Sequence, residues 1–536
     1  MSKTKKLNLR SRSLISYFIF TVLVFQQVHG DIDLVTSGKL SCSSTSSNFG
    51  TSVKAIGDVN GDEIADFIVG MPGYDNNKGA IAIIYGSSSG IPSVDVCSDS
   101  FTTKDGYIIK SESTAAGSKF GSSLSGVGDI NKDGIEDIVV GAPYYTSGAI
   151  SSVGRAYIIL LPETPSSKSF SIDSLTTPMT STAGSYYTLT GVSIMTYIGS
   201  FVTGVGDVNN DGVPDVLVGA PSGNGAAYIL YGKMDATNLD ISNIAATDGY
   251  TILGDFGEML GYGASGCSDI NGDGIPDMFI SAVYRQRLYL LYGKEGTDRT
   301  SITAPLTATD GVMLTDPSTF GLAQTISCGD IDGDGKVDAV IGLLTYGRVY
   351  VLFGSFLTTL PTYGTFDFSS LTPEQGFAID GDTNYFGQYV SAAGDVNGDG
   401  IADIVLTYEN YSPTGSSPYY GAAYVIYGNK AGLASFSIST LTSSQGYRIV
   451  GPAESRLGSS IDTSKDINGD GVNDIIIGAS SEKSTYIVYG TCGLPGYYLD
   501  KTCTECSPVC ATCTANTTCQ TCIANYALTN NYCNYI

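Results

Sequence analysis

The chain has 536 residues and is strongly acidic, with 52 Asp and Glu against 27 Lys and Arg and a formal net charge of -25. This balance argues against binding to nucleic acid or to anionic membrane surfaces. The single histidine, His29, lies in a segment that we expect to be removed, which excludes His-dependent catalytic triads and His-ligated zinc from the mature chain. The 67 Gly and 36 Tyr favour an all-β protein with many tight turns.

Residues 1–30 predict a secretory signal peptide. Five Lys and Arg and no acidic residue precede an apolar stretch from Leu14 to Phe25, and small residues end at Gly30 before a cleavage point at Asp31. A retained signal anchor is the alternative, but the apolar stretch is short for a membrane span. No later stretch approaches the length of a span. We expect a secreted or extracellular chain, retained at a cell surface through a partner.

One nine-residue pattern, D-x-N-x-D-G-x-x-D, occurs seven times at intervals of 61 to 78 residues. Side-chain oxygens fall at positions 1, 3, 5 and 9, Gly at position 6 permits a left-handed turn, and position 7 offers its backbone carbonyl. Oxygen ligands that converge on one point are what Ca²⁺ requires, so we predict up to seven calcium sites. The predicted ligands are Asp58, Asn60, Asp62, Ile64 and Asp66; Asp129, Asn131, Asp133, Ile135 and Asp137; Asp207, Asn209, Asp211, Val213 and Asp215; Asp269, Asn271, Asp273, Ile275 and Asp277; Asp330, Asp332, Asp334, Lys336 and Asp338; Asp395, Asn397, Asp399, Ile401 and Asp403; and Asp466, Asn468, Asp470, Val472 and Asp474.

These loops differ from EF-hands, which need a bidentate Glu at position 12. Position 12 is aliphatic in all seven copies, from Val69 to Ile477, and belongs to a short apolar run that predicts a buried strand. Glu63 replaces Gly at position 6 of the first copy, so the loop at Asp58 is the least certain site. Lys336 stands at position 7 of the fifth copy, where only the carbonyl is needed. We favour a structural role for the metal over a gating role.

Residues 31–490 repeat one order of parts around each Asp loop. An aromatic or aliphatic residue with Gly comes first, then a strand, the loop, a second strand ending at Gly-Ala-Pro, a third ending at Tyr-Gly, and a looser fourth. Four short strands in seven units predict a seven-bladed β-propeller, with the stretch from Asp31 to Leu40 completing the last blade. The first pairs are Phe49-Gly50, Phe120-Gly121, Ile198-Gly199, Leu260-Gly261, Phe320-Gly321, Phe386-Gly387 and Leu457-Gly458. Gly-Ala-Pro has diverged to Ser281-Ala282-Val283, Gly342-Leu343-Leu344 and Leu406-Thr407-Tyr408.

This combination resembles the FG-GAP repeat of the integrin α-subunit head. The resemblance implies a closed seven-bladed ring, Ca²⁺ in hairpin loops on one face, ligand contacts on the other face, and a partner subunit. The chain departs from integrins in carrying the loop in all seven units and in lacking a long stalk and a membrane span. A glycosylphosphatidylinositol-specific phospholipase D shares the repeat, but its zinc domain needs His residues and a separate N-terminal region that are absent here.

Residues 491–536 predict a cysteine-rich module. Eight cysteines from Cys492 to Cys533 predict a small disulfide-stapled unit in a secreted chain, with connectivity undetermined, and zinc binding is the alternative. The run resembles furin-like or growth-factor-receptor repeats. Cys42 and Cys97 are candidates to bridge the first blade. Cys267 and Cys328 form either a disulfide or buried thiols, and we favour thiols because that strand position otherwise holds small residues.

The sequence thus favours a non-enzymatic, calcium-binding adhesion or recognition glycoprotein, with an extracellular protein or glycan as ligand. The main alternative is a calcium-stabilised, lectin-like propeller that uses Tyr in place of the absent Trp; a calcium-dependent polysaccharide lyase or phospholipase-like enzyme ranks below it. Asn410-Tyr411-Ser412 and Asn516-Thr517-Thr518 are N-glycosylation sequons. The tyrosines that follow the Gly-Ala-Pro positions are Tyr74, Tyr144, Tyr145, Tyr284, Tyr346, Tyr408, Tyr411 and Tyr420.

Overall fold

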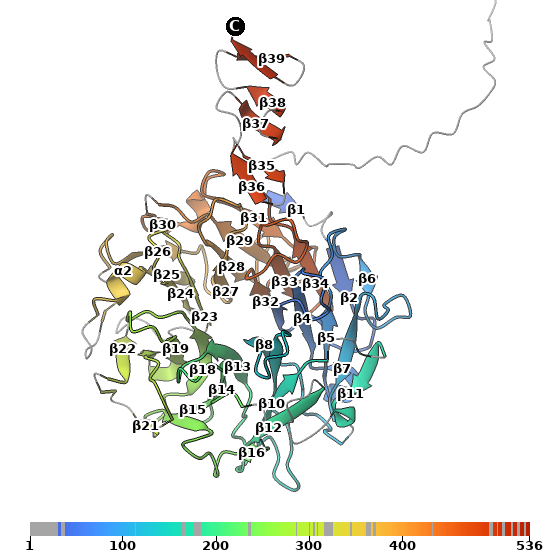
Figure 1. The fold of residues 1–536 in the computed structure, drawn as a ribbon, viewed down its shortest axis with the longest axis vertical. Coiled ribbons are helices and arrows are strands. Elements are labelled where there is room, and N and C mark those ends of the chain that lie inside the picture. The colour runs from blue at the N-terminus through green and yellow to red at the C-terminus, as the bar shows by residue number, and fades with distance from the viewer. Residues whose placement is uncertain are drawn as a thin grey trace, which may run out of the picture.

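A computed structural model describes residues 31–33 and 38–491, apart from short internal gaps of which 176–183 and 316–324 are the longest, together with six strands between 497 and 535. Seven sheets stand radially around a central axis (Figure 1). The predicted all-β, seven-bladed β-propeller is therefore confirmed. The expected signal peptide, Phe320-Gly321 and the sequon at Asn516 lie outside the described residues.

Each blade is a meander of four antiparallel strands, counted here from the axis outward. Blade 1 contains β3 (Val53–Ile56), β4 (Asp66–Met71), β5 (Ala80–Ile84) and β7 (Gly106–Lys110). Blade 2 contains β8 (Ser123–Gly128), β9 (Asp137–Ala142), β10 (Arg155–Leu160) and β12 (Ser185–Thr190). Blade 3 contains β13 (Phe201–Gly206), β14 (Asp215–Ala220), β15 (Ala226–Leu230) and β17 (Gly249–Leu253). Blade 4 contains β18 (Leu260–Gly266), β19 (Met278–Ala282), β20 (Arg287–Leu291) and β22 (Gly311–Thr315).

The remaining blades follow the same plan, and short helical turns occur in the connections. Blade 5 contains β23 (Thr325–Gly329), β24 (Asp338–Leu343), β25 (Arg348–Leu352) and β26 (Gly376–Asp380). Blade 6 contains β27 (Val390–Gly394), β28 (Asp403–Tyr408), β29 (Ala422–Ile426) and β31 (Gly446–Val450). Blade 7 contains β32 (Ser460–Asp462), β33 (Ile475–Ala479), β34 (Ser484–Val488) and β2 (Gly38–Ser41). The helical turns are α1 (Tyr74–Asn77), η1 (Ile172–Ser174), η2 (Val283–Arg285), α2 (Gly354–Leu357) and η4 (Ile438–Thr440).

The hydrophobic core is divided among the seven interfaces between neighbouring blades. Strand 2 of each blade supplies both sides: Ile138 and Val140 pack toward blade 1, whereas Val139 packs toward blade 3. Because successive side chains of a strand point to opposite faces, a strand that is buried on both faces needs a continuous apolar run. This explains the unbroken apolar runs after each Asp loop.

The N-terminal strand closes the ring, as predicted. β2 pairs antiparallel with β34 and becomes the outer strand of blade 7. In blades 1 to 6, the connection between strands 3 and 4 pairs in parallel with the outer strand of the preceding blade. Blade 7 differs because its strands 3 and 4 come from distant parts of the chain. β1 (Asp31–Asp33) makes the same pairing with β31, so the first residues act as the connection of blade 7. The short strands of these connections are β6 (Val94–Asp95), β11 (Ser169–Ser171), β16 (Leu239–Asp240), β21 (Ile302–Thr303) and β30 (Phe436–Ser437).

The glycines of the repeat hold neighbouring blades together. Gly121 N–H donates to the Gly141 carbonyl within blade 2 at 3.0 Å, so the first and third motifs of one unit meet. A Cβ on Gly141 would stand 2.0 Å from the Gly199 carbonyl of blade 3. The same close approach closes the ring, where a Cβ on Gly478 would stand 2.0 Å from the Gly50 carbonyl.

One predicted register is corrected by this contact. In blade 6, Gly387 N–H donates to the Thr407 carbonyl at 2.9 Å, so Thr407 occupies the position of the first Gly in Gly-Ala-Pro. The diverged motif of blade 6 is therefore Thr407-Tyr408-Glu409 and not Leu406-Thr407-Tyr408. The register is counted from Asp403, at position 9 of the loop. Four residues after that aspartate, five other blades have a glycine and blade 4 has Ser281.

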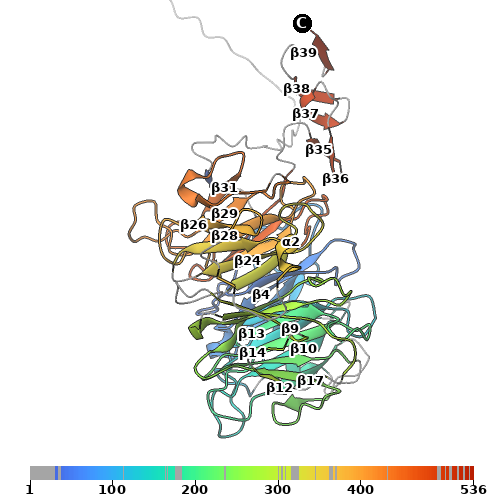
Figure 2. The same cartoon turned by 90° about the vertical axis from the view of Figure 1, so that its left-hand side faces the viewer.

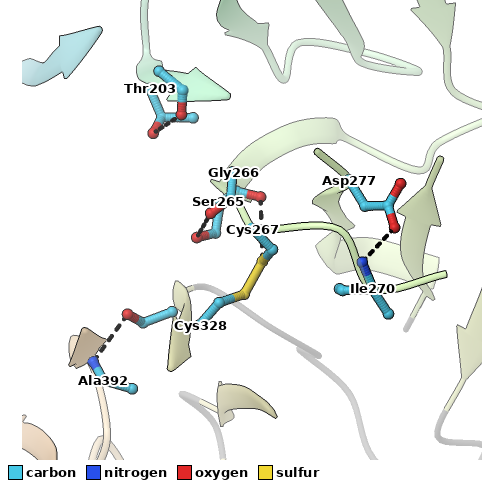
Figure 3. Close-up of a disulfide and its surroundings, with 10 residues drawn as sticks. Thr203, Ser265, Gly266, Cys267, Ile270, Asp277, Cys328 and Ala392 are labelled. Carbon is cyan, nitrogen blue, oxygen red and sulfur yellow. Dashed lines mark hydrogen bonds between the residues drawn. A yellow bond between two sulfur atoms is a disulfide. The ribbon is translucent and has the colours of Figure 1, made fainter. Parts of the chain in front are cut away.

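Two disulfides link neighbouring blades. The prediction that Cys267 and Cys328 are buried thiols is wrong: they form a disulfide between the inner strands of blades 4 and 5, with Cα atoms 5.7 Å apart (Figure 3). Inner strands converge on the axis, which brings equivalent positions of adjacent blades within disulfide reach. Cys42 and Cys97 are also bonded, but they join the end of β2 in blade 7 to the connection of blade 1.

Three two-stranded hairpins follow blade 7 and extend from the rim of the ring (Figures 1 and 2). They pair β35 (Tyr497–Asp500) with β36 (Thr502–Glu505), β37 (Cys510–Ala515) with β38 (Thr518–Cys522), and β39 (Tyr526–Thr529) with β40 (Tyr532–Tyr535). Side chains of this region are outside the described residues, so the cysteine-rich module remains a prediction. Among the described helices, none has the length and apolar character that crossing a bilayer requires.

Replacing Gly141 by Ala should lower the free energy of unfolding by about 1–3 kcal/mol or more, because the new Cβ collides with a backbone carbonyl of the next blade. Gly148→Ala is the control, since Gly148 has φ 59° and no heavy atom within 4 Å of the added Cβ. That change should cost only about 1 kcal/mol of backbone strain. Chemical denaturation of both variants measures the difference, and equal losses would contradict this role of the glycine.

Candidate functional site

The candidate metal sites are built on the aspartate at position 9 of each loop, the first residue of strand 2 or its neighbour. All seven of these carboxylates are at most 1% exposed. In the second loop Asp137 Oδ2 accepts the Ile130 N–H from position 2 at 2.9 Å, and Oδ1 accepts the Leu161 N–H from the end of strand 3 at 3.1 Å. Both contacts recur in all seven blades, and Figure 3 shows the first of them at Asp277 and Ile270.

The other predicted ligands line a tightly turned loop around that carboxylate. In the sixth loop Asp395 accepts backbone N–H groups from Gly398, Asp399 and Gly400 at 2.6–3.1 Å. Asn397 Oδ1 accepts the Asp399 N–H, and Asp399 Oδ1 accepts the N–H of position 7. Positions 1, 3 and 5 are therefore held in one hydrogen-bonded turn next to the position 9 carboxylate, and their binding of a metal stays a prediction.

Left-handed backbone at two positions produces this turn, of which the sequence pattern predicted only one. Position 6 has φ between 69° and 91° in all seven loops, and Glu63 in the first loop adopts the same conformation. Position 4 is also left-handed in all seven, with φ between 57° and 83°. Five loops have Gly at position 4, which indicates a left-handed backbone there. Lys132 and Asn210 occupy that position in the other two loops and obscured the pattern.

The loops concentrate negative charge. They hold three aspartates each, with a fourth in loop 5, and no ion pair within the described residues includes any of them. Burial raises the pKa of the position 9 carboxyl, to about 8 at Asp137 and to about 6 at Asp277, and the backbone hydrogen bonds offset only part of this shift. The buried position 9 carboxylate would therefore be stabilised by a cation bound in the loop.

The donor set fits a hard divalent cation. Carboxylate and amide oxygens make up the predicted side-chain ligands, and Ca²⁺ takes six to eight oxygen ligands. Acidic groups cluster most closely in loop 5, where ligand oxygens of Asp330, Asp332 and Asp338 lie within 4.8 Å of one another. Lys336 is exposed there, and its N–H donates to Asp334 Oδ1 at 2.8 Å, so its ammonium need not enter the site.

The Tyr-Gly motif completes the loop from the third strand. Gly428 N–H donates to Asp403 Oδ1 at 2.9 Å, and a Cβ on Gly428 would stand 2.6 Å from the Ile401 side chain at position 7. The glycine therefore leaves room for the position 7 side chain while it binds the buried carboxylate. Equivalent approaches occur at Gly232 and Gly490.

The opposite face of the ring carries the exposed apolar side chains. In an antiparallel meander, the Asp loops and the connections between strands 3 and 4 share one face, and the remaining connections share the other. All eleven large hydrophobic residues that are exposed among the described residues lie in or beside connections of this second face. They are Tyr144, Ile150, Val192, Ile194, Met195, Leu253, Phe256, Tyr262, Tyr284, Tyr346 and Tyr385.

The eight tyrosines singled out in the sequence separate into two groups. Tyr144, Tyr284 and Tyr346 are exposed by 42%, 66% and 47%. The other five are partly buried, and four of these pack against the hydrophobic clusters between blades; they are Tyr74, Tyr145, Tyr408, Tyr411 and Tyr420. The first group therefore presents the larger side-chain surface to solvent.

One polar contact that supports this face was not indicated by any sequence pattern. In blade 4, Glu258 accepts hydrogen bonds from Arg287 at 2.5 Å and from the Tyr289 hydroxyl at 2.6 Å. Glu112 with Arg155 repeats this arrangement in blade 2, and Glu482 with Lys39 repeats it in blade 7. Each acid comes from a connection and each Tyr from strand 3, so the contact anchors that connection on its blade.

Comparison with known proteins identifies the repeat. FG-GAP repeats match residues 120–159, 200–230, 387–426 and 457–490, and an FG-GAP-like repeat matches residues 269–341. Integrin alpha-5 of Xenopus laevis is 28% identical over 45% of this chain and 21% of its own length. Integrin alpha-IIb of Mus musculus is 32% identical over 31% and 15%, and integrin alpha pat-2 of Caenorhabditis elegans is 27% identical over 52% and 20%.

The ring is an integrin α-like FG-GAP propeller. The chain spans about a fifth or less of the length of these relatives, so the likeness concerns the propeller alone. The matched repeats correspond to blades 2 to 7 of the FG-GAP propeller. Blade 1 has the same strands and the same loop contacts in the structure, including the bonds that Asp66 accepts from Val59 and Gly86.

Replacing Glu63 by Gly should raise the free energy of unfolding of the FG-GAP propeller by about 1 kcal/mol, because Glu63 holds φ 69°. The reciprocal control is Gly134→Ala in the second loop, where φ is 91° and nothing lies near the added Cβ. That change should lower stability by a similar amount. Thermal melts of both variants in Ca²⁺ provide the measurement, and a Glu63→Gly variant that melts below the parent would contradict the strain.

Proposed function

We propose that this chain is a secreted, calcium-binding adhesion or recognition protein that presents a ligand-binding face on the side opposite its Asp loops. The observation that carries the proposal is the segregation of the two faces. Acidic loops occupy one side of the ring, and the exposed apolar side chains of the described residues occupy the other. Exposed aromatic residues in connections on a rigid scaffold favour a recognition surface.

Calcium has a structural role in this proposal. A cation in each loop would neutralise the convergent carboxylates and fix the turn between strands 1 and 2. The proposed ligands are the predicted residues of all seven loops, with the loop at Asp58 the weakest because Glu63 strains its turn. We assign no catalytic residue, since the convergent carboxylates are those of the loops themselves.

The remaining parts follow the same proposal. Residues 1–30 serve as a signal peptide, residues 31–490 form the propeller, and residues 491–536 form a disulfide-stapled tail that acts as a spacer. The likeness to integrin α chains favours an extracellular ligand and a partner subunit. Asn410 lies partly exposed in a connection of the apolar face, which suits N-glycosylation there.

Removing Ca²⁺ with a chelator should lower the melting temperature by at least about 10 °C. Extracellular calcium modules bind at roughly 10⁻⁴–10⁻³ M, so a tenfold excess of metal contributes about 1.4 kcal/mol per site and about 10 kcal/mol over seven sites. Differential scanning calorimetry with and without chelator measures the shift. An unchanged melt would refute the calcium proposal.

Elemental analysis of single-site variants locates the metal. Asp395→Ala should reduce the bound calcium by one ion per chain, whereas Asp382→Ala, at an exposed aspartate outside the loops, should leave the count unchanged. Equal counts in both variants would remove the sixth loop from the set of sites.

Replacing Tyr284 and Tyr346 together by Ser should abolish most retention of protein-coated beads on cells of the source organism, because aromatic side chains dominate many binding surfaces. The control variant replaces Lys104 and Glu295 by Ser; both are exposed on the Asp-loop face, and the pair leaves net charge unchanged. Retention is counted in Ca²⁺. Equal retention of both variants would contradict the assignment of the face.

A further inference from the structure

A ring of strained residues surrounds the axis on the apolar face. The residue just before each aromatic or aliphatic-Gly pair has left-handed backbone in the six blades where it is described, with φ between 51° and 72°. None of the six is Gly, although a non-Gly residue in this conformation costs about 1–2 kcal/mol. If these positions served only to form a turn, Gly would be favoured. The side chains that occupy them are therefore candidates for a function. The residues are Asn48, Lys119, Tyr197, Met259, Tyr385 and Arg456.

Backbone bonds from neighbouring loops hold Lys119 of this ring in place. Its N–H donates to the Asn77 carbonyl of blade 1 at 2.9 Å. Tyr144, in the next connection, donates its N–H to the Ser118 carbonyl at 3.2 Å. The two residues are therefore positioned by the main chain before any ligand arrives, which lowers the entropy cost of binding.

Lys119 lies in a groove of about 380 Å³ that crosses blades 1 to 3. Its ammonium stands 4.5 Å from the centroid of the Tyr144 ring, and that ring meets Tyr197 edge-on with centroids 5.5 Å apart. The groove shares Thr51, Ser122 and Ser200 with a second cavity, which is lined by inner-strand residues including Val53, Leu124 and Val202. The groove is therefore continuous with the space between the inner strands.

The ammonium of Lys119 has no carboxylate partner within the described residues. Neighbouring cations of the same face are neutralised, Lys78 by Asp75 and Arg155 by Glu112. The Tyr144 ring orients the Lys119 ammonium by a cation–π contact and leaves its charge uncompensated. The groove is thus prepared for an anionic group, and the net charge of -25 disfavours a ligand with many anionic groups.

The hydroxyls of the groove are oriented as acceptors. Thr51, Ser122 and Ser200 donate their hydroxyl hydrogens to the carbonyls of Asn48, Lys119 and Tyr197 at 2.7–2.8 Å. Their lone pairs remain for donors of a ligand. A sugar ring supplies several hydroxyl donors close together, whereas a short acidic peptide supplies one backbone N–H per residue.

We propose that this groove binds a saccharide with one isolated carboxylate, such as a terminal sialic or uronic acid. The carboxylate meets the Lys119 ammonium, the sugar hydroxyls donate to Thr51, Ser122 and Ser200, and the exposed part of Tyr144 covers an apolar face of the ring. This inference rests on the proposed recognition face and assigns its ligand class.

Calorimetric titration of the full secreted chain in Ca²⁺ tests the inference. The probes are 3′-sialyllactose and a glucuronate-terminated disaccharide, with lactose as the neutral control and a Gly-Asp-Gly peptide as the acidic alternative. At least one acidic sugar should bind at least about tenfold more tightly than lactose and the peptide. Lys119→Gln should lower that affinity at least about tenfold, and Lys119→Arg should retain most of it.

Lys104→Gln is the matched control, because it removes the same charge from the opposite face. It should leave the affinity within about twofold of the parent. Equal binding of lactose, unchanged binding by Lys119→Gln, preference for the peptide, or no binding of either acidic sugar would each overturn the inference. The titrations could show no preference for acidic sugars while retention of the beads still depends on the tyrosines. That result would refute the proposed ligand class and leave the proposed recognition face supported.

Discussion

The structure depends on one repeated interaction, the burial of the position 9 aspartate between two backbone N–H groups. One donor comes from the Asp loop and the other from the end of strand 3, so a single carboxylate ties the first three strands of a blade together. The burial that makes this contact rigid also makes the negative charge unfavourable, as the raised pKa of Asp403 to about 8 reflects. A divalent cation bound in each loop would neutralise this charge within its own blade.

Close backbone contact between blades imposes the second constraint. In five of the seven blades, the glycine near the end of strand 2 has no room for a Cβ because a carbonyl of the next blade lies there. This contact leaves little freedom in the angle between those blades and their neighbours. The connections on the two faces of the ring can then differ in sequence. One face carries the acidic loops, and the other carries the exposed apolar side chains.

The strained positions fall on both faces with different consequences. On the Asp-loop face, left-handed backbone turns the ligand oxygens inward, and Gly fills most of these positions. On the opposite face, Lys119 and Tyr197 hold the same conformation with large side chains. Gly at these positions would relieve the backbone strain. The chain instead keeps large side chains there, facing solvent, as a ligand-binding surface requires.

Local spacing that repeats seven times was enough to predict the number of blades, the order of strands and the position of each Asp loop. The metal ligands proposed in those loops rest on the same spacing. Tertiary structure alone decided which distant residues meet. The disulfide between Cys267 and Cys328 and the groove around Lys119 depend on the angle between blades, and Thr407 takes its register from a contact with Gly387. Local patterns carry no record of such contacts, since partners 20 to 60 residues apart are set by how whole blades pack.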